Sequence, residues 1–485
     1  MALIKPQDYY DFIKNLEANV YINGEKVTDL MSHPVTKTAV DATAKMYELA
    51  LEPEYEQVMT AKSHLSGEKI NRNLHVNQDV NDLENRAEMA LLASQKLGTC
   101  NYRCVGCDAI NAMASVCWEI DKDKGTNYQQ RLNDFLSEAQ ENDWAISGAV
   151  TDAKGDRRKR ISEEEPDMHV HVSHEDDNGI YVRGAKLHQS GAICSHYTLV
   201  IPGGALREGE EKFAVAFAVP NNAPGLTYIC QYNPYSAERE QSDDVEELGN
   251  PKYGQRETSM MIFEDVFIPW ERVFMYGERE FAVNCISRFA KTHRMNCGGA
   301  CKVGYADIII GASALAAEMS GTDKASHIRD MLTEMVRLSE TARAATIAAY
   351  YKGLEEPEGS GVFMPDDMFG NVAKITTAEN FWQIMAMAGD IAGGMVVTAP
   401  SMKELKNSET KPYIEKYLRA AAPAEERLKI NKVLQNWVAG LHGAGTWHGA
   451  GSPQAQKMSL ARVVDWDEKK KIAKEMAGLD KNNHS

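Results

Sequence analysis

Residues 302–356 read KVGYADIIIGASALAAEMSGTDKASHIRDMLTEMVRLSETARAATIAAYYKGLEE and decide the fold of the C-terminal half. Apolar side chains recur at intervals of three and four on both sides of a short polar break, which predicts two long helices, 302–321 and 325–356. Residues 379–394 and 425–441 repeat the pattern. Four helices with wide apolar faces predict a four-helix bundle, and we expect part of that apolar surface to be buried against other subunits.

The residue pattern before the bundle changes once, from helical periodicity to short β-rich runs. Residues 1–145 are helical in character, whereas residues 146–280 consist of short β-rich runs separated by Gly, Pro, Asn and Asp. We therefore predict an α+β fold with an N-terminal helical domain (1–145), a middle β-barrel domain (146–280) and a C-terminal four-helix-bundle domain (281–485). This order resembles the acyl-CoA-dehydrogenase architecture, in which a flavin lies between the β domain and the bundle.

Composition limits the classes of partner. The 485-residue chain has a formal net charge of -17, which argues against a nucleic-acid partner because such recognition normally needs a basic face. The basic run GDRRKR at 155–160 is a solvated turn or an anchor for phosphates. The N-terminal residues MALIKPQDYYDF do not resemble a signal peptide, and no stretch approaches the roughly 18 apolar residues of a spanning helix. We expect a cytoplasmic protein with no membrane partner.

Nine cysteines, an odd number, favour free thiols, metal ligation or redox work over a disulfide framework. The segment TCNYRCVGCDAINA (99–112) holds Cys100, Cys104 and Cys107, whose sulfurs would share one stripe on a helix. The segment HRMNCGGACK (293–302) adds a histidine and two more cysteines. These donors can bind an iron–sulfur cluster or a structural zinc ion, and core packing is the plain alternative. The cysteines outside both segments are interpreted as packing residues: Cys117, Cys194, Cys230 and Cys285.

Five further motifs carry a family resemblance that covers essentially the whole chain. In combination they resemble the 4-hydroxyphenylacetate 3-hydroxylase family of flavoproteins, and the two cysteine segments resemble its 4-hydroxybutyryl-CoA dehydratase branch. The motifs are VTDAKGDRRK (150–159), GAKLHQSGAICSHY (184–197), FEDVFIPWERVF (263–274), GDIAGGMVVTAPS (389–401) and HGAGSPQAQ (448–456).

The resemblance implies an FAD site and usually a homotetramer. Asp152 and Thr151 would offer hydrogen bonds to the isoalloxazine edge, and Arg157 would face the pyrophosphate. Bare backbone at Gly393 and Gly394 would let the flavin of a second subunit approach closely, although each glycine alone is equally well a tight turn. The residues that fall where the family holds flavin are Val150, Thr151, Asp152, Lys154, Gly155, Asp156, Arg157, His188, Gln189 and Ser190.

The resemblance also implies a [4Fe-4S] cluster. Its ligands in the branch, three cysteines and one histidine, map to Cys100, Cys104, His293 and Cys301. Two departures stand out. Cys297 occupies the place of a branch tyrosine and is an alternative ligand to Cys301, and the interval between the histidine and the last cysteine is one residue longer. Gly445 stands where the branch has a glutamate.

Candidate proton-transfer groups follow from the same motifs. Glu257 is a candidate acid or base near the flavin, with an exposed strand glutamate as the alternative. His448 and His442 suit proton transfer near pH 7 if they line the pocket. Lys302 either polarises a bound carbonyl or caps a helix end. Cys297, in place of the tyrosine, completes the catalytic candidates.

The leading functional hypothesis is a radical dehydratase that acts on a hydroxyacyl-CoA, with FAD and the cluster as cofactors and vinylacetyl-CoA Δ-isomerase activity as an associated reaction. Loss of water would need removal of a β-hydrogen that nothing activates, and acid–base catalysis alone supplies only about 10²–10⁴-fold. One-electron chemistry through the flavin would acidify that hydrogen. The alternatives are a flavin-dependent aromatic monooxygenase, which needs no cluster, and a non-catalytic iron–sulfur or zinc assembly protein.

Overall fold

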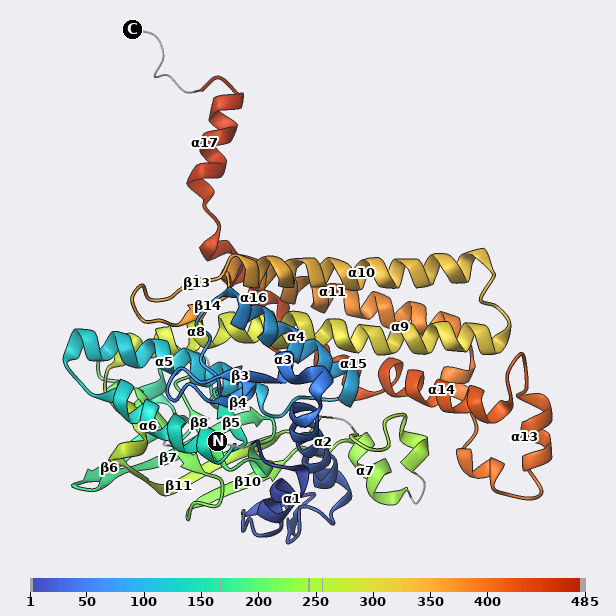
Figure 1. Cartoon of the computed structure of the whole chain (residues 1–485), viewed down its shortest axis with the longest axis horizontal. Coiled ribbons are helices and arrows are strands. Elements are labelled where there is room, and N and C mark those ends of the chain that lie inside the picture. The colour runs from blue at the N-terminus through green and yellow to red at the C-terminus, as the bar shows by residue number, and fades with distance from the viewer. Residues whose placement is uncertain (1–2, 157, 166, 243–244, 255, 480–485) are drawn as a thin grey trace.

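The computed structural model describes residues 3–156, 158–165, 167–242, 245–254 and 256–479, without the side chains of residues 245, 441, 442 and 448. The β region lies on one side of the molecule and the long C-terminal helices on the other (Figure 1). Helix α5 runs between these two parts and packs on strand β5 and on helix α8.

The elements follow one another in three groups. The first group is α1 (Pro6–Lys14), β1 (Val20–Ile22), β2 (Glu25–Val27), α2 (Pro34–Leu51), α3 (Glu56–Met59), β3 (Thr60–Lys62), β4 (Lys69–Asn71), α4 (Val80–Leu97), α5 (Cys104–Lys124) and α6 (Tyr128–Glu141). The second is β5 (Ile146–Ala149), β6 (His171–Asp176), β7 (Gly179–Gln189), β8 (Tyr197–Val200), β9 (Val215–Pro220), β10 (Leu226–Cys230), α7 (Pro234–Gln241), β11 (Ser259–Pro269) and β12 (Val273–Tyr276). The third is α8 (Ala282–His293), a π-helix (Arg294–Ala300), α9 (Cys301–Ser320), α10 (Ser326–Tyr351), β13 (Leu354–Glu355), β14 (Phe363–Met364), α11 (Asp367–Ala392), α12 (Met395–Thr398), α13 (Lys411–Tyr417), α14 (Ala424–Val438), α15 (Leu441–His448), α16 (Pro453–Val463) and α17 (Trp466–Met476).

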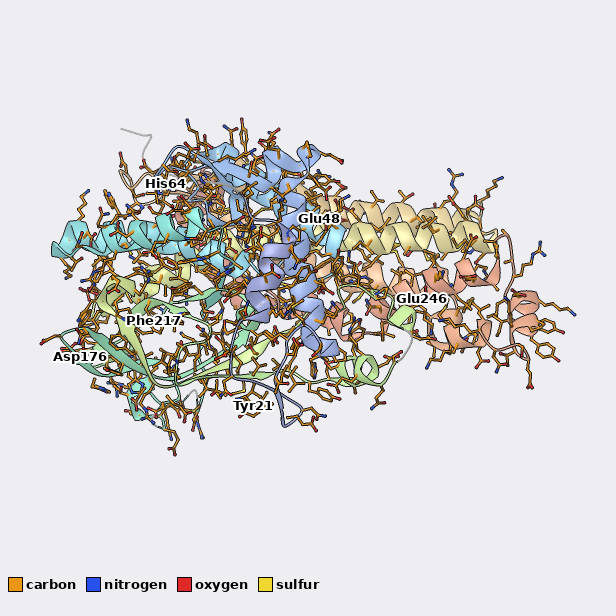
Figure 2. All side chains as sticks on the ribbon, turned by 60° about the horizontal axis from the view of Figure 1, so that its bottom comes forward. Tyr21, Glu48, His64, Asp176, Phe217 and Glu246 are labelled. Carbon is orange, nitrogen blue, oxygen red and sulfur yellow. The ribbon has the colours of Figure 1, made fainter. Side chains whose placement is uncertain are left out.

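The β region consists of two sheets and not of the barrel that the sequence predicts. One sheet has the strand order β2-β1-β10-β11-β7-β6 and the other the order β12-β9-β8-β5. Phe217 on β9 and Phe263 on β11 meet edge to face, with 5.9 Å between ring centroids, so the sheets pack against each other. Figure 2 labels Phe217 within this β region. Helices α5 and α6 pack on the terminal strands β5 and β12 of the smaller sheet, and the described strands do not close into a barrel.

The first 145 residues contain strands as well as the predicted helices. Strand β1 pairs in parallel with β10, with Val20 opposite Tyr228, and β2 extends the same sheet. Each of these strands has only three residues, which is too short for a periodic pattern to reveal. The N-terminal segment is thus joined to the β region by backbone hydrogen bonds.

The four long C-terminal helices are α9, α10, α11 and α14, and they pack on one another. Helices α10 and α11 have 26 residues each and run side by side (Figure 1). The continuous stretch Arg279–Ser320 is long and apolar enough to cross a membrane by length and composition, but 67% of its most apolar window is buried inside the protein. That degree of burial is typical of a core helix.

The π-helix between α8 and α9 explains how the longer histidine-to-cysteine interval is accommodated. A π turn holds one residue more than an α turn, and such turns are frequent at functional sites. Gly299 lies so close to α10 that a β-carbon there would stand 2.3 Å from Thr346 Oγ1. Glycine is therefore required where the π-helix presses against the bundle, and the direction of the helix that follows is preserved.

Candidate functional site

The candidate site is a buried cavity of about 130 Å³ between α4, the loop before α5, the π-helix and the start of α9. Both cysteine segments reach it although they are almost 200 residues apart in the chain. The polar and sulfur-bearing residues that line it include Cys100, Cys104, Arg256, Cys297, Cys301 and Lys302. The tertiary fold therefore brings together four of the nine cysteines.

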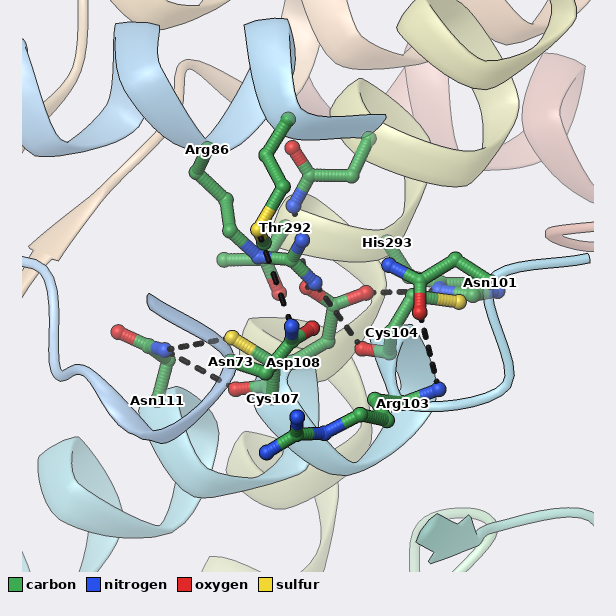
Figure 3. Close-up of polar contacts among 12 residues, drawn as sticks. Asn73, Arg86, Asn101, Arg103, Cys104, Cys107, Asp108, Asn111, Thr292 and His293 are labelled. Carbon is green, nitrogen blue, oxygen red and sulfur yellow. Dashed lines mark hydrogen bonds and ion pairs between the residues drawn. The ribbon is translucent and has the colours of Figure 1, made fainter. Parts of the chain in front are cut away.

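The predicted stripe of three sulfurs on one helix is wrong. Helix α4 ends at Gly98, which adopts a left-handed conformation (φ 59°), and α5 begins only at Cys104, so that Cys100 lies in the loop between them. The thiols of Cys100 and Cys104 nevertheless lie close enough to shift each other: Cys104 lowers the pKa of Cys100, and Cys100 raises the pKa of Cys104. Cys107 does not line the cavity, and its thiol contacts the carbonyl oxygen of Arg72 at 3.7 Å. The Asn111 side chain also contacts this thiol (Figure 3).

His293 is held by a buried carboxylate. Its Nδ1 lies 2.8 Å from Asp108 Oδ2, and Asp108 Oδ1 accepts hydrogen bonds from Arg86 and Asn296 (Figure 3). The Cys297 thiol lies near enough to the ring to raise the pKa of His293. Burial lowers the pKa of His293, but Cys297 and Asp108 outweigh burial and raise it to about 10. A carboxylate that fixes one ring nitrogen and leaves the other for a sulfur or a metal is a common arrangement around metal centres.

Three cations surround the cysteines. Lys302 is only 4% exposed, and its Nζ lies 3.7 Å from Cys297 Sγ and 3.9 Å from Cys301 Sγ. Arg256 faces the cavity with them. Lys374 donates hydrogen bonds to the carbonyl oxygens of Thr446 and Trp447, and burial lowers its pKa to about 7. Neighbouring positive charge favours thiolates, the form of cysteine that binds metals.

The donor set fits a cluster better than a single ion. Among the described residues, no three His, Cys, Asp or Glu side chains converge on one point in a way that could hold a single metal ion. A structural zinc ion needs four ligands on one atom, so the geometry disfavours zinc. In a [4Fe-4S] cube each ligand binds a different iron, and the ligands stand around a core as the four cysteines stand around this cavity.

Glu257 is buried, contrary to its alternative reading as an exposed strand glutamate. It precedes β11 and is 2% exposed, and its backbone N–H donates to Tyr102 Oη at 3.0 Å. No described group makes a hydrogen bond of normal geometry to either carboxylate oxygen, although the Cys230 thiol and the Gly191 N–H are near enough to lower its pKa. Burial dominates and raises the pKa of Glu257 to about 8.

The two segments predicted to hold flavin lie side by side. Leu187 donates its N–H to the carbonyl oxygen of Thr151 at 2.7 Å, and Asp152 pairs with Lys186 through a bridge of 2.6 Å between Oδ1 and Nζ. The Asp152 carboxylate is therefore already ion-paired. The buried Lys186 ammonium also donates to the carbonyl oxygens of Val150 and Ile201.

The neighbouring positions of this flavin segment differ in exposure. His188 is exposed with a φ of 64°, whereas Gln189 and Ser190 are buried. Gly155 is in a left-handed conformation (φ 51°), and Asp156 pairs with Arg158, next to the exposed Lys154. We call residues 150–156 and 186–190 the cradle. Its exposed members are Lys154, Gly155 and His188.

Two predicted flavin-binding glycines, Gly393 and Gly394, are not brought to the cavity or the cradle of their own chain. Gly393 and Gly394 are exposed at the far end of α11, away from the β region of the same chain (Figure 1). No described atom lies within 4 Å of the β-carbon position of Gly393. Arg157 lies outside the described residues, and the side chains of His442 and His448 lie outside the described part of α15.

Tyr102 is a site residue that the sequence motifs did not single out. It lies between the two cysteines of the loop before α5 and is 1% exposed. Besides its hydrogen bond from Glu257, it packs on Gly191, where a β-carbon would stand 2.5 Å from Tyr102 Cβ. Tyr102 thus joins the cysteine loop to the cradle. The spacing of a tyrosine within CNYRC gave no signal of this contact.

Comparisons with known proteins agree with the geometry. Models of the N-terminal and C-terminal parts of 4-hydroxyphenylacetate 3-hydroxylase match residues 5–275 and 282–478. A 4-hydroxybutyryl-CoA dehydratase/vinylacetyl-CoA-Δ-isomerase from Clostridium aminobutyricum is 39% identical, over 98% of this chain and 100% of that protein.

Solved structures extend the likeness to three dimensions. The structure of an oxygen-tolerant archaeal 4-hydroxybutyryl-CoA dehydratase from N. maritimus matches with a TM-score of 0.95 at 37% identity, over 100% of this chain and 97% of that one. The oxygenase component of 4-hydroxyphenylacetate 3-monooxygenase, complexed with FAD and 4-hydroxyphenylacetate, matches with a TM-score of 0.84 at 24% identity over 98% of each chain, which shows a shared fold alone. The chain therefore belongs to the 4-hydroxyphenylacetate 3-hydroxylase family, in its 4-hydroxybutyryl-CoA dehydratase branch.

Proposed function

We propose that the protein is a lyase that removes water from a hydroxyacyl-CoA of the 4-hydroxybutyryl-CoA type, with an associated vinylacetyl-CoA Δ-isomerase activity. The 39% identity to the clostridial enzyme over nearly the whole chain supports the enzyme class. The observation that carries the proposal is the cavity in which four cysteines face two cations. An oxygenase that uses only flavin and oxygen has no need of such a thiol set.

The proposal assigns two cofactors. A [4Fe-4S] cluster would occupy the cavity, with the branch set of Cys100, Cys104, His293 and Cys301 as the ligands implied by resemblance. FAD would lie on the cradle, where Thr151 and Ser190 can hydrogen-bond the ring system. The FAD-bound oxygenase of the same fold supports FAD as the cofactor, and the placement on the cradle follows from the family resemblance. When bound, the two groups supply one-electron transfer and Lewis acidity toward the departing hydroxyl.

The residues of the chain supply the proton chemistry and the electrostatics. Glu257, ionised, takes the α-proton of the acyl thioester; a pKa near 8 is well matched to a base at neutral pH. Lys302 and Arg256 stabilise negative charge that develops on the thioester carbonyl oxygen. Cys100, Cys104, Cys297, Cys301 and Lys302 are buried, and low exposure to water strengthens such electrostatic interactions.

A homotetramer is part of the proposal. Gly393 and Gly394 are exposed and far from the cradle of their own chain, so a second subunit would be needed to bring them to a flavin. The nearby Val397 is 76% exposed. Contact with another subunit would cover this surface.

The test is turnover by anaerobically purified protein. We expect conversion of 4-hydroxybutyryl-CoA to an enoyl-CoA, with a stoichiometric gain of water and no net consumption of reductant. Hydroxylation of 4-hydroxyphenylacetate with reduced FAD and oxygen, without dehydration of the thioester, would overturn the proposal in favour of the monooxygenase. If the purified protein contains zinc and shows neither dehydration nor hydroxylation, a structural role is favoured instead.

A further inference from the structure

The proposed function leaves open which hydroxyacyl group enters the cavity, and the charges around the cavity narrow the choice. We infer that the acyl chain of the substrate carries a carboxylate, so that the substrate is a CoA monothioester of a hydroxy-dicarboxylic acid. This carboxylate binds the Arg256 guanidinium where it faces Gly445 of helix α15 and Gly449 at the end of that helix. The inference rests on the proposed function, because it names the substrate class of the same site.

Arg256 has no acidic partner within the described part of the chain. Its guanidinium makes no hydrogen bond and no ion pair there, and only its backbone carbonyl oxygen is used, by Gln231 Nε2. The neighbouring Glu257 does not pair with it, since neither carboxylate oxygen of Glu257 has a described hydrogen-bond partner. Arg256 nevertheless lines the cavity. A cation withdrawn from water without a counter-charge is costly, and a bound anion would remove that cost.

Lys302 places a second cation beside Arg256. A β-carbon at Gly449 would stand 3.5 Å from Lys302 Nζ and 3.6 Å from Arg256 Nη1, so the two charged groups flank one glycine. Lys302 is 4% exposed and has no carboxylate partner among the described residues. The negative charge that develops on the thioester oxygen occupies one side of this pair. A second, permanent negative charge balances the other side.

Helix α15 meets Arg256 with bare backbone. A β-carbon at Gly445 would stand 3.4 Å from Arg256 Nη2, so the two terminal nitrogens of the guanidinium face two glycines one helical turn apart. Lys374 fixes this wall, because its Nζ donates to the carbonyl oxygens of Thr446 and Trp447. No side chain of the two glycines covers the planar fork, and such a fork binds a carboxylate through two parallel hydrogen bonds.

The acyl chain is the part of the substrate that can bring this carboxylate. The phosphates of CoA are separated from the thioester by the whole pantetheine arm, whereas Arg256 lines the same cavity as the predicted cluster ligands Cys100, Cys104 and Cys301. A neutral acyl chain that ends in a hydroxyl group accepts a hydrogen bond but brings no charge. A buried charge left unpaired is the basis on which a site discriminates against such a chain.

The first test is binding, which needs no turnover. Glutaryl-CoA is butyryl-CoA with a carboxylate added at C4, and neither compound can lose water because both lack the hydroxyl group. Isothermal titration of anaerobically purified wild-type protein should show that glutaryl-CoA binds at least about tenfold more tightly, as expected for one charge-assisted contact. Equal or weaker binding of glutaryl-CoA would overturn the inference.

The second test is selectivity, measured as the ratio of kcat/KM for 4-carboxy-4-hydroxybutyryl-CoA to kcat/KM for 4-hydroxybutyryl-CoA. Both thioesters should be dehydrated, with a ratio above about 10 in the wild type. Gly445→Glu places a carboxylate of the chain itself beside Arg256 and should lower this ratio by about 100-fold or more, through like-charge repulsion. Gly445→Gln, the uncharged control of the same size, should lower it less. A ratio that Gly445→Glu leaves unchanged would contradict the assignment of Arg256.

The inference and the proposed function fail in different ways. A wild-type protein that dehydrates 4-hydroxybutyryl-CoA but binds glutaryl-CoA and butyryl-CoA alike removes the inference and leaves the dehydratase intact. A protein that dehydrates neither thioester removes the proposed function, and the inference fails with it because it names a substrate of that reaction.

Discussion

The cavity and the cradle differ in how complete they are within one chain. The cavity gathers four thiols and two cations from segments far apart in the sequence, and the Asp108-bound His293 lies behind it. The cradle is open, its Asp152 is already paired with Lys186, and the glycines expected to complete it lie at the far end of α11. On the proposed function, one cofactor site would be built by the fold of a single chain and the other would be completed by assembly with a second subunit.

The largest effect is expected from a change in the cavity alone. Cys104→Ser should abolish cluster binding and dehydration, because a ligand thiolate is lost. FAD binding at the cradle and assembly of the subunits should persist. Cys107→Ser is the matched control, since Cys107 is in the same helix but contacts Arg72 and Asn111 instead. Metal analysis and size-exclusion chromatography check this. Unchanged iron in Cys104→Ser would show that the cavity is not the cluster site.

Glu257→Gln should lower kcat by about 10²–10⁴-fold, since the base is removed while its shape is kept. In the wild type, kcat/KM should rise with pH through about 8, the pKa of Glu257, and this limb should vanish in the variant. A retained limb would assign the proton transfer to another group.

Stability gives an independent check on the same residue. The folded state holds the Glu257 proton more tightly than the unfolded chain, because burial raises the pKa from 4.5 to about 8. The free energy of unfolding of the wild type should therefore fall as pH rises from about 4.5 to 8, and it should fall less in Glu257→Gln. Denaturant titrations across this range measure the difference. Parallel curves would mean that the carboxyl group is not buried in solution.

A change confined to the cradle should do the opposite of Cys104→Ser. Asp152→Asn leaves the buried Lys186 ammonium without its carboxylate, which should cost about 3–5 kcal/mol of unfolding free energy. FAD binding should weaken, while iron content stays unchanged. Flavin absorbance and iron analysis of the same sample separate the two sites, and joint loss of both would argue that they are one cooperative unit.

The sequence predicts the long C-terminal helices and several candidate ligands, because these depend on residue patterns within short segments. Apolar periodicity finds α9, α10, α11 and α14, and residue types mark Cys100 and Cys301 as possible ligands. The prediction that Cys107 shares a stripe with Cys100 and Cys104 fails because no residue pattern in this segment marks Cys104 as the start of α5. The sequence also misses the role of Tyr102, because the contacts with Gly191 and Glu257 depend on tertiary packing.

The barrel prediction fails for a related reason. Strand patterns identify the β-rich segments but not which strands pair, and β1 and β2 come from a segment that otherwise looks helical. Pairing across some 200 residues is decided by long-range packing, which periodicity does not record. The family resemblance uses motifs from the whole chain and is confirmed, whereas local periodicity alone does not predict the pairing of the strands.

Asp108→Asn should weaken cluster retention by about 10–100-fold, because the group that fixes His293 loses its charge. Glu119→Gln, which removes a carboxylate that pairs with Arg288 away from the cavity, serves as the control. Competition with an iron chelator measures retention. Equal rates of iron loss in both variants would show that Asp108 acts only on stability.

The smallest effect is expected from the contact between the two sites. Tyr102→Phe removes the acceptor for the Glu257 N–H, a hydrogen bond worth about 0.5–1.5 kcal/mol, and should lower kcat by about 10-fold or less. The apparent pKa of the pH–rate profile should shift, whereas iron and flavin contents stay constant. A profile identical to that of the wild type would mean that Tyr102 does not position Glu257.

The central claim is that two distant segments of one chain grip an iron–sulfur core beside a flavin. The most direct test is to measure iron, sulfide and FAD together on anaerobically purified wild-type protein. The account predicts about four irons, as many sulfides and one flavin per chain, the composition of one cube and one cofactor. Flavin without iron, or zinc without flavin, would contradict it.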